Sequence, residues 1–407
     1  MGNYIGLTLK CLSLYMQRVE RHIAIGNKRL DELCFLSKNL YNYVNYLIRQ
    51  EFTQSKKFLS EYEVTTMLAK DKQADYIALL AQTSQQIIKI LFKNWKGFFK
   101  LCKVKDKLKS RPKLPKYKHK TKGRNIVVFT NQQCKLKDGY IHFPKRAGIE
   151  PIRTKVDNLC QVRIIPQCSC HIIEVVYEKE KEEATELDDT AYLSIDLGLN
   201  NLATSFDPQH NRCFVINGRP LKSMNQFFNK RKAFLMSLIG SRGMSIRIGR
   251  LTLKRNCKVH DYMHKASRFI VNYCKDNHIG NIVIGNNKDW KQNCNMSKVN
   301  NQNFVSIPFE KLISMIQYKC EEVGIKVTVT EESYTSKTDH YSDEAMCHHN
   351  NYMGKRIKRG LFRSASGKLI NADLNGAIGI LRKVVGERLW QIADRGVVAT
   401  PSRIQFV

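Results

Sequence analysis

The segment "AYLSIDLGLNNLATSFD", residues 191 to 207, contains the strand on which a mixed α/β domain is predicted to be built. It indicates an apolar strand that carries Asp196 near its end, a turn at Gly198, and then a second strand. An aspartate at the end of a strand can hold a divalent cation, because its own backbone competes little for the carboxylate. An aspartate that only forms the turn would give the same pattern.

A second acidic motif, "GKLINADLNGAIGILRKVV", occupies residues 367 to 385. Apolar residues at positions 374, 377, 378 and 381 follow the helical period, which predicts a helix with Asp373 and Asn375 at its start. The simpler interpretation of Asp373 is an acid that complements the helix dipole.

The composition indicates a polyanionic partner. The 407 residues leave room for two or three domains, and 68 basic against 36 acidic residues give a formal charge of +32. A compact protein with so much like charge repels itself, and nucleic acid would offset that repulsion. The basic residues recur along the whole chain, which favours nucleic acid over a membrane. No apolar stretch reaches the roughly 20 residues needed to span a bilayer, so we expect no membrane partner.

The N-terminus and the cysteines both favour an intracellular protein. "MGNYIGLTLK" lacks the plan of a signal peptide and has Gly6 where myristoylation requires Ser or Thr. None of the thirteen cysteines forms a C-x-x-C motif, and the closest pair, Cys168 and Cys170, lies in a strand-like segment. We expect buried, reduced thiols rather than disulfides or a metal site.

The chain changes character along its length. Residues 1–27 contain a β-like run, and residues 28–110 follow a helical pattern, in which Thr83 or Ser84 is a candidate N-cap. Strand-like pieces fill residues 111–188 and indicate a small antiparallel barrel or sandwich, which ends in an acidic run at 178–189 that is predicted to be a linker. Residues 189–407 alternate strands with helices, as in a mixed α/β domain.

A basic tract, residues 96–124, contains a single acid, Asp106, and two prolines that stop the helix. A solvated linker is one interpretation. Because Phe98, Phe99 and Tyr117 lie among the lysines, we favour a surface that contacts phosphates and stacks on bases. The candidate phosphate contacts are Lys113, Lys116, Lys118 and Lys120.

In their order and separation, the two acidic motifs resemble the RuvC-type nuclease motifs of the transposon-encoded TnpB (OrfB) family. Relatives of that family are the type V CRISPR effectors and the eukaryotic Fanzor proteins. The resemblance covers nearly the whole chain. The segments that carry it include "HDYMHKASRFIVNYCKDNHIGNIVIG", "NNQNFVSIPFEKLISMIQYKCEEVGIKV", "ESYTSK" and "INADLNGA".

The resemblance implies an RNA-guided DNA endonuclease with an α+β multidomain fold. A wedge β-barrel, formed by residues 1–27 and 111–188, would be interrupted by a helical recognition lobe at 28–110. A ribonuclease-H-like (RuvC) α/β nuclease domain would follow over residues 189–407, with a helical insertion at about 218–278. The implied partners are guide RNA and target DNA, with no obligate protein partner, and the implied cofactor is Mg²⁺, as two ions. Such a protein would lie in the cytoplasm or nucleoid of a bacterium, or in the nucleus if its host is eukaryotic or viral.

One departure from the family pattern concerns the third metal-binding acid. Family members carry a glutamate after the strand that "NIVIG", residues 281–285, predicts, whereas here Gly285 and two asparagines follow. Strand 281–285, a helix around 308–323 and a strand in "GIKVTVTEESYTSK" form a unit whose strands should be parallel and about 4.8 Å apart.

An acid at the end of the second strand could therefore reach the same site, as in Fanzor and some TnpB proteins, where it precedes a "TS" pair. Counted back from the "TS" pair at Thr335, the resemblance makes Glu332 the better match, with Glu331 in reserve. Because alternate strand residues face opposite ways, only one of the two should point at the metals. The resemblance thus implies that Asp196, Glu332 and Asp373 are the catalytic residues and metal ligands. Two exposed acids at a strand end are the alternative interpretation.

The second departure concerns the zinc ribbon, which is degenerate at about 338–366. Asp339 and Ser342 occupy the positions of the usual C-x-x-C pair, and no second pair of ligands follows Cys347, His348 and His349. We therefore expect no structural zinc. The segment "GKRIKRGLFR" offers a basic loop that we interpret as a contact to target-strand phosphates, with a solvated charge run as the alternative. Its candidate residues are Lys355, Arg356, Lys358 and Arg359.

Two other functions remain open from the sequence. A nuclease-deficient family member that binds DNA under RNA guidance would act as a repressor, and the missing glutamate favours it. A transposase that joins DNA through the same fold is disfavoured, because cleavage is the activity that the resemblance implies. A guide-dependent cleavage assay and a strand-transfer assay would separate the three.

Overall fold

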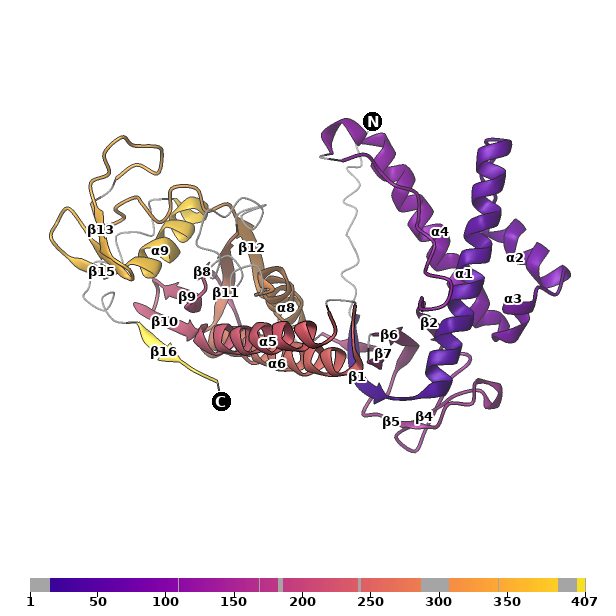
Figure 1. The fold of residues 1–407 in the computed structure, drawn as a ribbon. Helices are drawn as coiled ribbons and strands as arrows, with labels where there is room; N and C mark the ends of the chain where they lie inside the picture. Colours follow the sequence, from indigo (N-terminus) through magenta and orange to yellow (C-terminus); the bar gives the residue numbers. More distant parts are fainter. Residues whose placement is uncertain are drawn as a thin grey trace, which may run out of the picture. The chain divides into compact units, whose positions relative to one another are not determined.

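The computed structural model describes residues 15–108, 110–167, 169–181, 186–240, 243–286, 307–342, 344–386 and 401–406. Residues 1–14, which hold most of the predicted β-like run, lie outside the described residues, and so do Cys168 and residues 287–306. The chain divides into two compact units, Met1–Glu180 and Lys181–Val407 (Figure 1).

Unit 1 contains two small antiparallel sheets. The larger has the strand order β1-β7-β6-β2, so that the first described strand of the unit pairs with its last. Its strands are β1 (Tyr15–Ile25), β2 (Val127–Thr130), β6 (Leu159–Pro166) and β7 (Cys170–Glu180). The smaller consists of β3 (Lys135–Lys137), β4 (Tyr140–His142) and β5 (Ile152–Arg153). The Lys-Asp-Gly turn between β3 and β4 has positive φ angles at Asp138 and Gly139.

Four helices of unit 1 lie in the sequence between β1 and β2. They are α1 (Lys28–Gln54), α2 (Glu61–Lys70), α3 (Ala74–Ala78) and α4 (Ala81–Lys103). The Asn27 side chain caps α1, and Ser60 and Glu63 form a capping box on α2. Side chains from α1 and α4 share one hydrophobic core with strands of both sheets. Within unit 1 the helices are therefore packed on the strands, and closure of the strands into a barrel stays a prediction.

Two local predictions for this part of the chain are wrong. Helix α4 begins at Ala81, so Thr83 and Ser84 lie inside the helix, where both are buried and the Ser84 hydroxyl donates to the Tyr76 carbonyl. The acidic linker is also shorter than predicted. Strand β7 continues to Glu180 and strand β8 already begins at Asp188.

Unit 2 is built on a six-stranded sheet with the order β12-β11-β8-β9-β10-β16. Strands β8, β9 and β10 form an antiparallel meander, whereas β11 and β12 extend the sheet in parallel beyond β8. Their bounds are Asp188–Leu197, Asn201–Asp207, Arg212–Asn217, Ile279–Gly285 and Lys326–Thr330, with β16 at Ser402–Ile404. The mixed α/β prediction for this part of the chain is confirmed.

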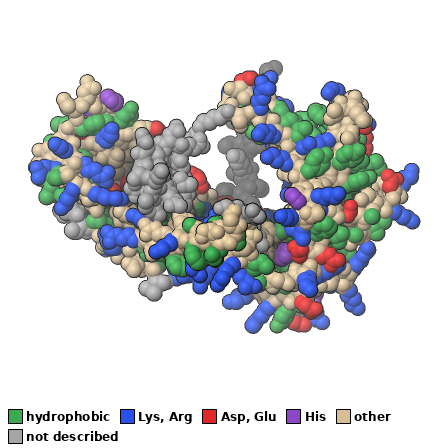
Figure 2. Space-filling model, in the orientation of Figure 1, with side chains coloured by type: hydrophobic (Ala, Val, Ile, Leu, Met, Phe, Trp, Pro, Cys, Tyr) green, Lys and Arg blue, Asp and Glu red, His purple; other side chains and the backbone are tan. Residues whose placement is uncertain are grey.

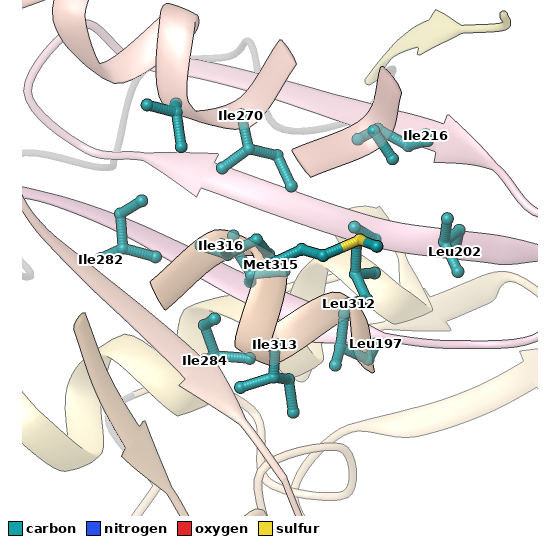
Figure 3. Close-up of a cluster of buried hydrophobic side chains, with 14 of the residues drawn as sticks. Leu197, Leu202, Ile216, Ile270, Ile282, Ile284, Leu312, Ile313, Met315 and Ile316 are labelled. Carbon is teal, nitrogen blue, oxygen red and sulfur yellow. The ribbon is translucent and has the colours of Figure 1, made fainter. Parts of the chain in front are cut away.

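Alternation along the strands divides the core of unit 2 into two layers. Ile282 and Ile284 of β11 pack with helices α5 (Arg219–Leu238), α6 (Ile246–Asp276) and α8 (Phe309–Glu322). Figure 3 shows these two isoleucines gathered with side chains of α8. Val283 instead packs with α9 (Ala372–Val385). Residues of opposite parity along β11 therefore meet different helices.

A three-stranded antiparallel sheet lies next to α9 in the sequence. It consists of β13 (Lys355–Lys358), β14 (Leu361–Arg363) and β15 (Leu369–Asn371). Strand β15 ends at the residue that caps α9, because the Asn371 side chain accepts hydrogen bonds from the Asp373 and Leu374 amides. The start of α9 is thereby fixed to this small sheet.

Candidate active site

The face of the sheet that α9 covers carries the predicted acids. Ile195 and Leu197 of β8 belong to the core on the α6 and α8 side, so Asp196 between them points to the α9 side. The same alternation in β11 turns position 285 toward α9. A Cβ atom built on Gly285 would lie 2.4 Å from Cδ1 of Ile380, a residue of α9. Two strand ends thus direct one position each toward the same helix.

Glu332 occupies the space above Gly285. Strands β11 and β12 are parallel neighbours, and Gly285 pairs with Thr330, which confirms the predicted strand arrangement. A Cβ atom at Gly285 would lie 2.6 Å from Oε1 and 2.7 Å from Cγ of Glu332. The side chain of Glu332 therefore fills the place that a side chain at position 285 would need. Glu331 points outward, with 70% of its side chain exposed.

Helix α9 brings the third acid and makes room for the first. Asp373 lies in its first turn, as predicted. A Cβ atom on Gly376, one turn later, would lie 2.7 Å from Oδ2 of Asp196. Only a glycine lets the helix approach the Asp196 carboxylate this closely. The tertiary structure therefore brings Asp196 to the helix that bears Asp373.

The carboxylates influence one another. Burial raises the pKa of Asp196 well above its ordinary value, and the negative charges of Glu332 and Asp373 raise it further. Burial also raises the pKa of Glu332 to about 7, while the Lys383 ammonium acts in the opposite direction. Lys383 belongs to α9, and its Nζ donates to the Glu331 carbonyl at 3.0 Å. A cation near these acids would relieve the electrostatic cost of ionising them.

Asp373 already has two partners. Its Oδ2 accepts a hydrogen bond from Nδ2 of Asn201 at 2.7 Å, and its Oδ1 lies 3.3 Å from Nη2 of Arg356. Among the residues that the structure describes, no three His, Cys, Asp or Glu side chains form a group that could hold a metal ion as they stand. The charges of Glu332 and Asp373 act on Asp196, but the three carboxylates do not stand in positions from which they could bind one metal ion together.

A cavity of about 810 Å³ opens in front of Asp196 and Asp373. Two acids and five basic residues are among the side chains that line it, a combination that suits a polyanion whose backbone must approach carboxylates. The basic lining residues are Arg219, Arg356, Lys358, Arg359 and Arg403. Glu332 is not among the described residues that line this cavity.

The basic loop forms the hairpin of β13 and β14, with Gly360 at a φ of 81° in the turn. Three of its four predicted residues, Arg356, Lys358 and Arg359, line the cavity, whereas Lys355 is exposed elsewhere on the hairpin. Basic side chains of the hairpin and the carboxylates of Asp196 and Asp373 therefore line the same cavity. The contact to target-strand phosphates stays a prediction, and so does the alternative of a solvated charge run.

The degenerate ribbon is held by hydrogen bonds around Asp339. This fully buried side chain accepts from the hydroxyls of Ser342 and Ser364 at 2.9 and 2.8 Å, and from the amides of Ala365 and Tyr341 at 2.7 and 3.1 Å. Residues 339–342 and 364–365 are thereby tied together. Cys347 and His349 are exposed and lie 3.4 Å apart. The absence of zinc stays a prediction.

In unit 1 the basic tract begins at the end of α4, and its part from Pro115 to Lys120 lies along α1 outside any regular helix or strand. Four α1 side chains donate to its carbonyl groups at successive turns of the helix. They are Lys38 to Lys120, Asn42 to Lys118, and Asn45 and Arg49 to Pro115. Because the tract is fixed by its backbone, its side chains are free to point outward.

The side chains of the tract differ in their surroundings. Lys113, Lys116 and Lys120 are exposed, whereas Lys118 is half-buried with its Nζ 5.1 Å from the ring of Tyr41, and burial lowers its pKa. The predicted stacking role of Phe98 and Phe99 is disfavoured, because both rings are half-buried. Phe99 packs against Phe52, Phe58 and Trp95, and Phe98 packs against Trp95 and Phe99. Tyr117 is exposed, with the Arg49 guanidinium 4.6 Å from its ring centroid.

Sequence reasoning missed several residues of the site. Asn201, Arg219 and Arg403 line the cavity, and Lys383 holds the backbone beside Glu332. Arg219 is the first residue of α5 and Arg403 lies on the edge strand β16. No local motif marks these positions, since they reach the site only through the pairing of β10 with β9 and β16.

Two family models match unit 2. A model described as OrfB_IS605, a probable transposase, matches residues 174–291, and a model of the Cas12f1-like TNB domain matches residues 309–380. The first match contains Asp196 and the second contains Glu332 and Asp373.

Whole-chain comparisons agree with these models. The chain is 26% identical to the TnpB-like protein ORF457 of Acidianus two-tailed virus, over 88% of this chain and 84% of that protein. Its fold is similar to the structure of a Cas12f1–sgRNA–target DNA complex, with a TM-score of 0.53, 16% identity, and coverage of 86% of this chain and 81% of that one. All ten cysteines within the described ranges are free thiols. None of the described helices is long and apolar enough to cross a membrane. The chain is therefore similar to TnpB (OrfB) proteins over most of its length.

Proposed function

We propose that this chain is an RNA-guided DNA endonuclease of the RuvC type, and that its active site contains Asp196, Glu332 and Asp373. The observation that carries the proposal is the placement of Glu332 over Gly285, on the face of the sheet where Asp196 meets α9. The missing glutamate of β11 is replaced there by an acid from the neighbouring strand. The sheet, with acids beside the ends of β8, β11 and β12, supports a ribonuclease-H-like core.

The donor set fits Mg²⁺, which prefers carboxylate oxygens. The negative charges of Glu332 and Asp373 raise the pKa of Asp196, so its ionisation is unfavourable beside them. A bound divalent cation would offset that repulsion. Asp196, Glu332 and Asp373 would hold the metal ions, which supply an activated water and charge stabilisation at the leaving 3′-oxygen when bound. The proposal requires that a metal ion take the place of the Arg356 guanidinium beside the Asp373 carboxylate.

The chain's own basic residues bind and orient the strand that is cut. Arg219, Arg356 and Arg403 lie on three separate elements around the cavity and would contact successive phosphates. Asn201 holds the Asp373 carboxylate through its side-chain amide. The similar Cas12f1 structure is a complex with an sgRNA and target DNA, and in this chain a guide RNA would select the DNA sequence by base pairing.

The wedge and recognition parts are assigned to unit 1. Residues 1–27 and 111–188 would form the wedge, and residues 28–110 the recognition lobe, with the basic tract as a surface for RNA or DNA backbone. The exposed lysines of the tract support this assignment. The guide RNA would come from the end of the element that encodes the chain, and no obligate protein partner would be required.

The test compares wild type with Glu332→Gln, in the presence of Mg²⁺ and of the RNA that copurifies with the protein, identified by sequencing. The amide keeps the size of the side chain and removes its charge, so DNA cleavage should be lost while RNA and DNA binding persist. Asp196→Asn and Asp373→Asn should behave alike. Glu331→Gln is the matched control, because its exposed side chain should leave the rate unchanged.

A guide-dependent repressor is the second candidate, and the lack of a ready three-carboxylate group among the described residues favours it. It predicts tight, guide-dependent DNA binding by wild type with no cleavage under any divalent cation. Equal cleavage by wild type and Glu332→Gln would instead remove Glu332 from the site.

A further inference from the structure

Helix α5 has an exposed face that its packing does not explain. Its inward positions Leu221, Asn225, Phe228, Lys232 and Leu235 recur at three- and four-residue steps and are buried or half-buried. On the opposite face, Phe227, Phe234 and Leu238 are 68%, 50% and 65% exposed. Large apolar side chains at such exposure on one helix face are unusual for a surface that meets only water.

The exposed face is cationic as well as aromatic. Lys230 and Arg231 lie between the two rings in the sequence and are both exposed. They are three or four residues from each ring, so all four side chains share one side of the helix. The Arg231 guanidinium lies 5.0 Å from the centroid of the Phe234 ring. We call Phe227, Lys230, Arg231 and Phe234 the α5 stripe.

The α5 stripe begins near the cavity of the proposed active site. Arg219, the first residue of α5, lines that cavity. At about 1.5 Å per residue, Phe227 lies about 12 Å further along the helix axis and Phe234 about 22 Å. Hydrophobic and basic side chains lie next to one another over the α5–α6 hairpin on the face drawn in Figure 2. The helix therefore leads from the cavity along a surface of mixed rings and cations.

We propose that the α5 stripe binds unpaired nucleotides of the DNA strand that enters the active site, with Phe227 and Phe234 stacking on bases and Lys230 and Arg231 contacting phosphates. Rings stack on any base, and cations between them follow the backbone, which is the chemistry of sequence-independent single-strand binding. The continuity with the cavity through Arg219 selects the substrate strand as the occupant. The inference rests on the proposed function, since it assigns that substrate a path.

A protein partner fits the stripe less well. An apolar docking surface would exclude charges from its centre, whereas Lys230 and Arg231 lie between the exposed rings. Self-association would place these cations of two copies close together in a chain whose formal charge is already +32. A polyanion turns the same charges into favourable contacts.

The first experiment measures binding of the full chain to a dye-labelled oligodeoxythymidine in EDTA, at several salt concentrations. Phe227→Leu with Phe234→Leu keeps an apolar surface but removes the rings, and should weaken binding on the order of tenfold per ring without changing the slope of log affinity against log salt. Lys230→Gln with Arg231→Gln should lower that slope, by about 0.7 for each phosphate that is no longer neutralised. Tyr62→Ala, which removes a 79% exposed ring of α2, is the matched control and should change neither quantity.

The second experiment locates the contact. An oligodeoxynucleotide carrying 5-iododeoxyuridine, which crosslinks to aromatic side chains on which it stacks, is irradiated with the protein, and the crosslinked peptides are identified by mass spectrometry. Crosslinks should map to Phe227 or Phe234 and disappear in the leucine variant.

Neither readout requires cleavage, so a chain that never cuts DNA can still confirm the stripe. Equal binding by wild type and the leucine variant, or crosslinks that avoid α5, would overturn the inference. Preferential crosslinking of an iodouridine RNA would reassign the stripe to the guide. A wild-type dimer in sedimentation velocity that Phe227→Ala with Phe234→Ala dissociates would reassign it to a second copy.

Discussion

At the scale of single residues, the site depends on two glycines as much as on its acids. Gly285 leaves the space that Glu332 fills, and Gly376 lets α9 approach the Asp196 carboxylate. Both glycines act through a close approach, because neither has a positive φ angle. The loss of an acid from β11 and the gain of one after β12 are therefore a single change in geometry. A side chain can occupy the site from either strand, but only one can do so at a time.

A methyl group at position 285 should displace Glu332. In Gly285→Ala the new Cβ would meet Ile380 and Glu332 at 2.4 and 2.6 Å, so we expect a loss of stability of about 1–3 kcal/mol and a large loss of cleavage. Nucleic-acid binding should persist. Thermal denaturation, a cleavage assay and a binding assay on the same preparation check the three expectations. Wild-type cleavage by this variant would contradict the placement of Glu332.

The acid should be transferable between the strands. Glu332→Ala vacates the space, and adding Gly285→Glu should restore part of the lost cleavage, because the new carboxylate points to the same face. Gly285→Gln in the Glu332→Ala background is the control, since it has the size without the charge. If the glutamate and glutamine versions cleave equally poorly, the two strand ends do not serve one site.

At the scale of elements, hydrogen bonds of buried carboxylates hold the segment between β12 and α9 together. Asp339 ties residues 339–342 to residues 364–365, and Glu344 accepts from the amides of Asp339 and Met353. Helix α9 is bound to the same segment, because the Arg382 guanidinium donates to the Glu344 carbonyl and the Asn375 amide to the Thr338 carbonyl. The helix that carries Asp373 is thereby anchored without a zinc ion in these contacts.

Removal of Asp339 should loosen this segment. Asp339→Ala leaves several buried donors without their acceptor, so we expect a loss of about 3 kcal/mol in the free energy of unfolding. Asp261→Ala, at an acid of α6 that is 65% exposed, should have little effect. Denaturant unfolding of both variants measures the difference.

The same account predicts that a zinc chelator leaves the melting temperature of the wild type unchanged. Elemental analysis should accordingly find much less than one zinc per chain. One zinc per chain, removed by chelation together with stability, would make Cys347, His348 and His349 candidate ligands again.

At the scale of the whole molecule, each unit carries its own basic surface. In unit 2 the cations surround acids, at the cavity. In unit 1 the basic tract is fastened to α1 by its backbone, so its exposed lysines form a fixed row instead of a loose tail. Basic side chains of the described residues are therefore carried by ordered elements in both units. Ordered charges lose little entropy when they bind a backbone.

The row of lysines should dominate the salt dependence of nucleic-acid binding by unit 1. Replacement of Lys113, Lys116 and Lys120 by Gln should weaken binding and reduce the slope of log affinity against log salt, by up to about 0.9 for each phosphate of duplex DNA that is no longer neutralised. Lys118→Gln is the matched control within the tract, because its half-buried ammonium faces Tyr41 and should matter less. If none of the four replacements changed the slope, the tract would have a structural role only.

The sequence by itself determined the α/β layout of unit 2, the helix at Asp373, the parallel neighbours β11 and β12 and the basic partner surface. Each follows from a local period or from composition, which the chain carries without reference to its fold. Glu332 could be preferred over Glu331 only through the resemblance, by its distance from the "TS" pair at Thr335, since alternation says that one of the two faces the site but not which. The tertiary structure alone decided that Glu332 lies over Gly285, that Arg356 pairs with Asp373, and which lysines of the tract point outward. These facts depend on contacts between segments far apart in the chain, and no local pattern of residues encodes the distance between two side chains that meet only after folding.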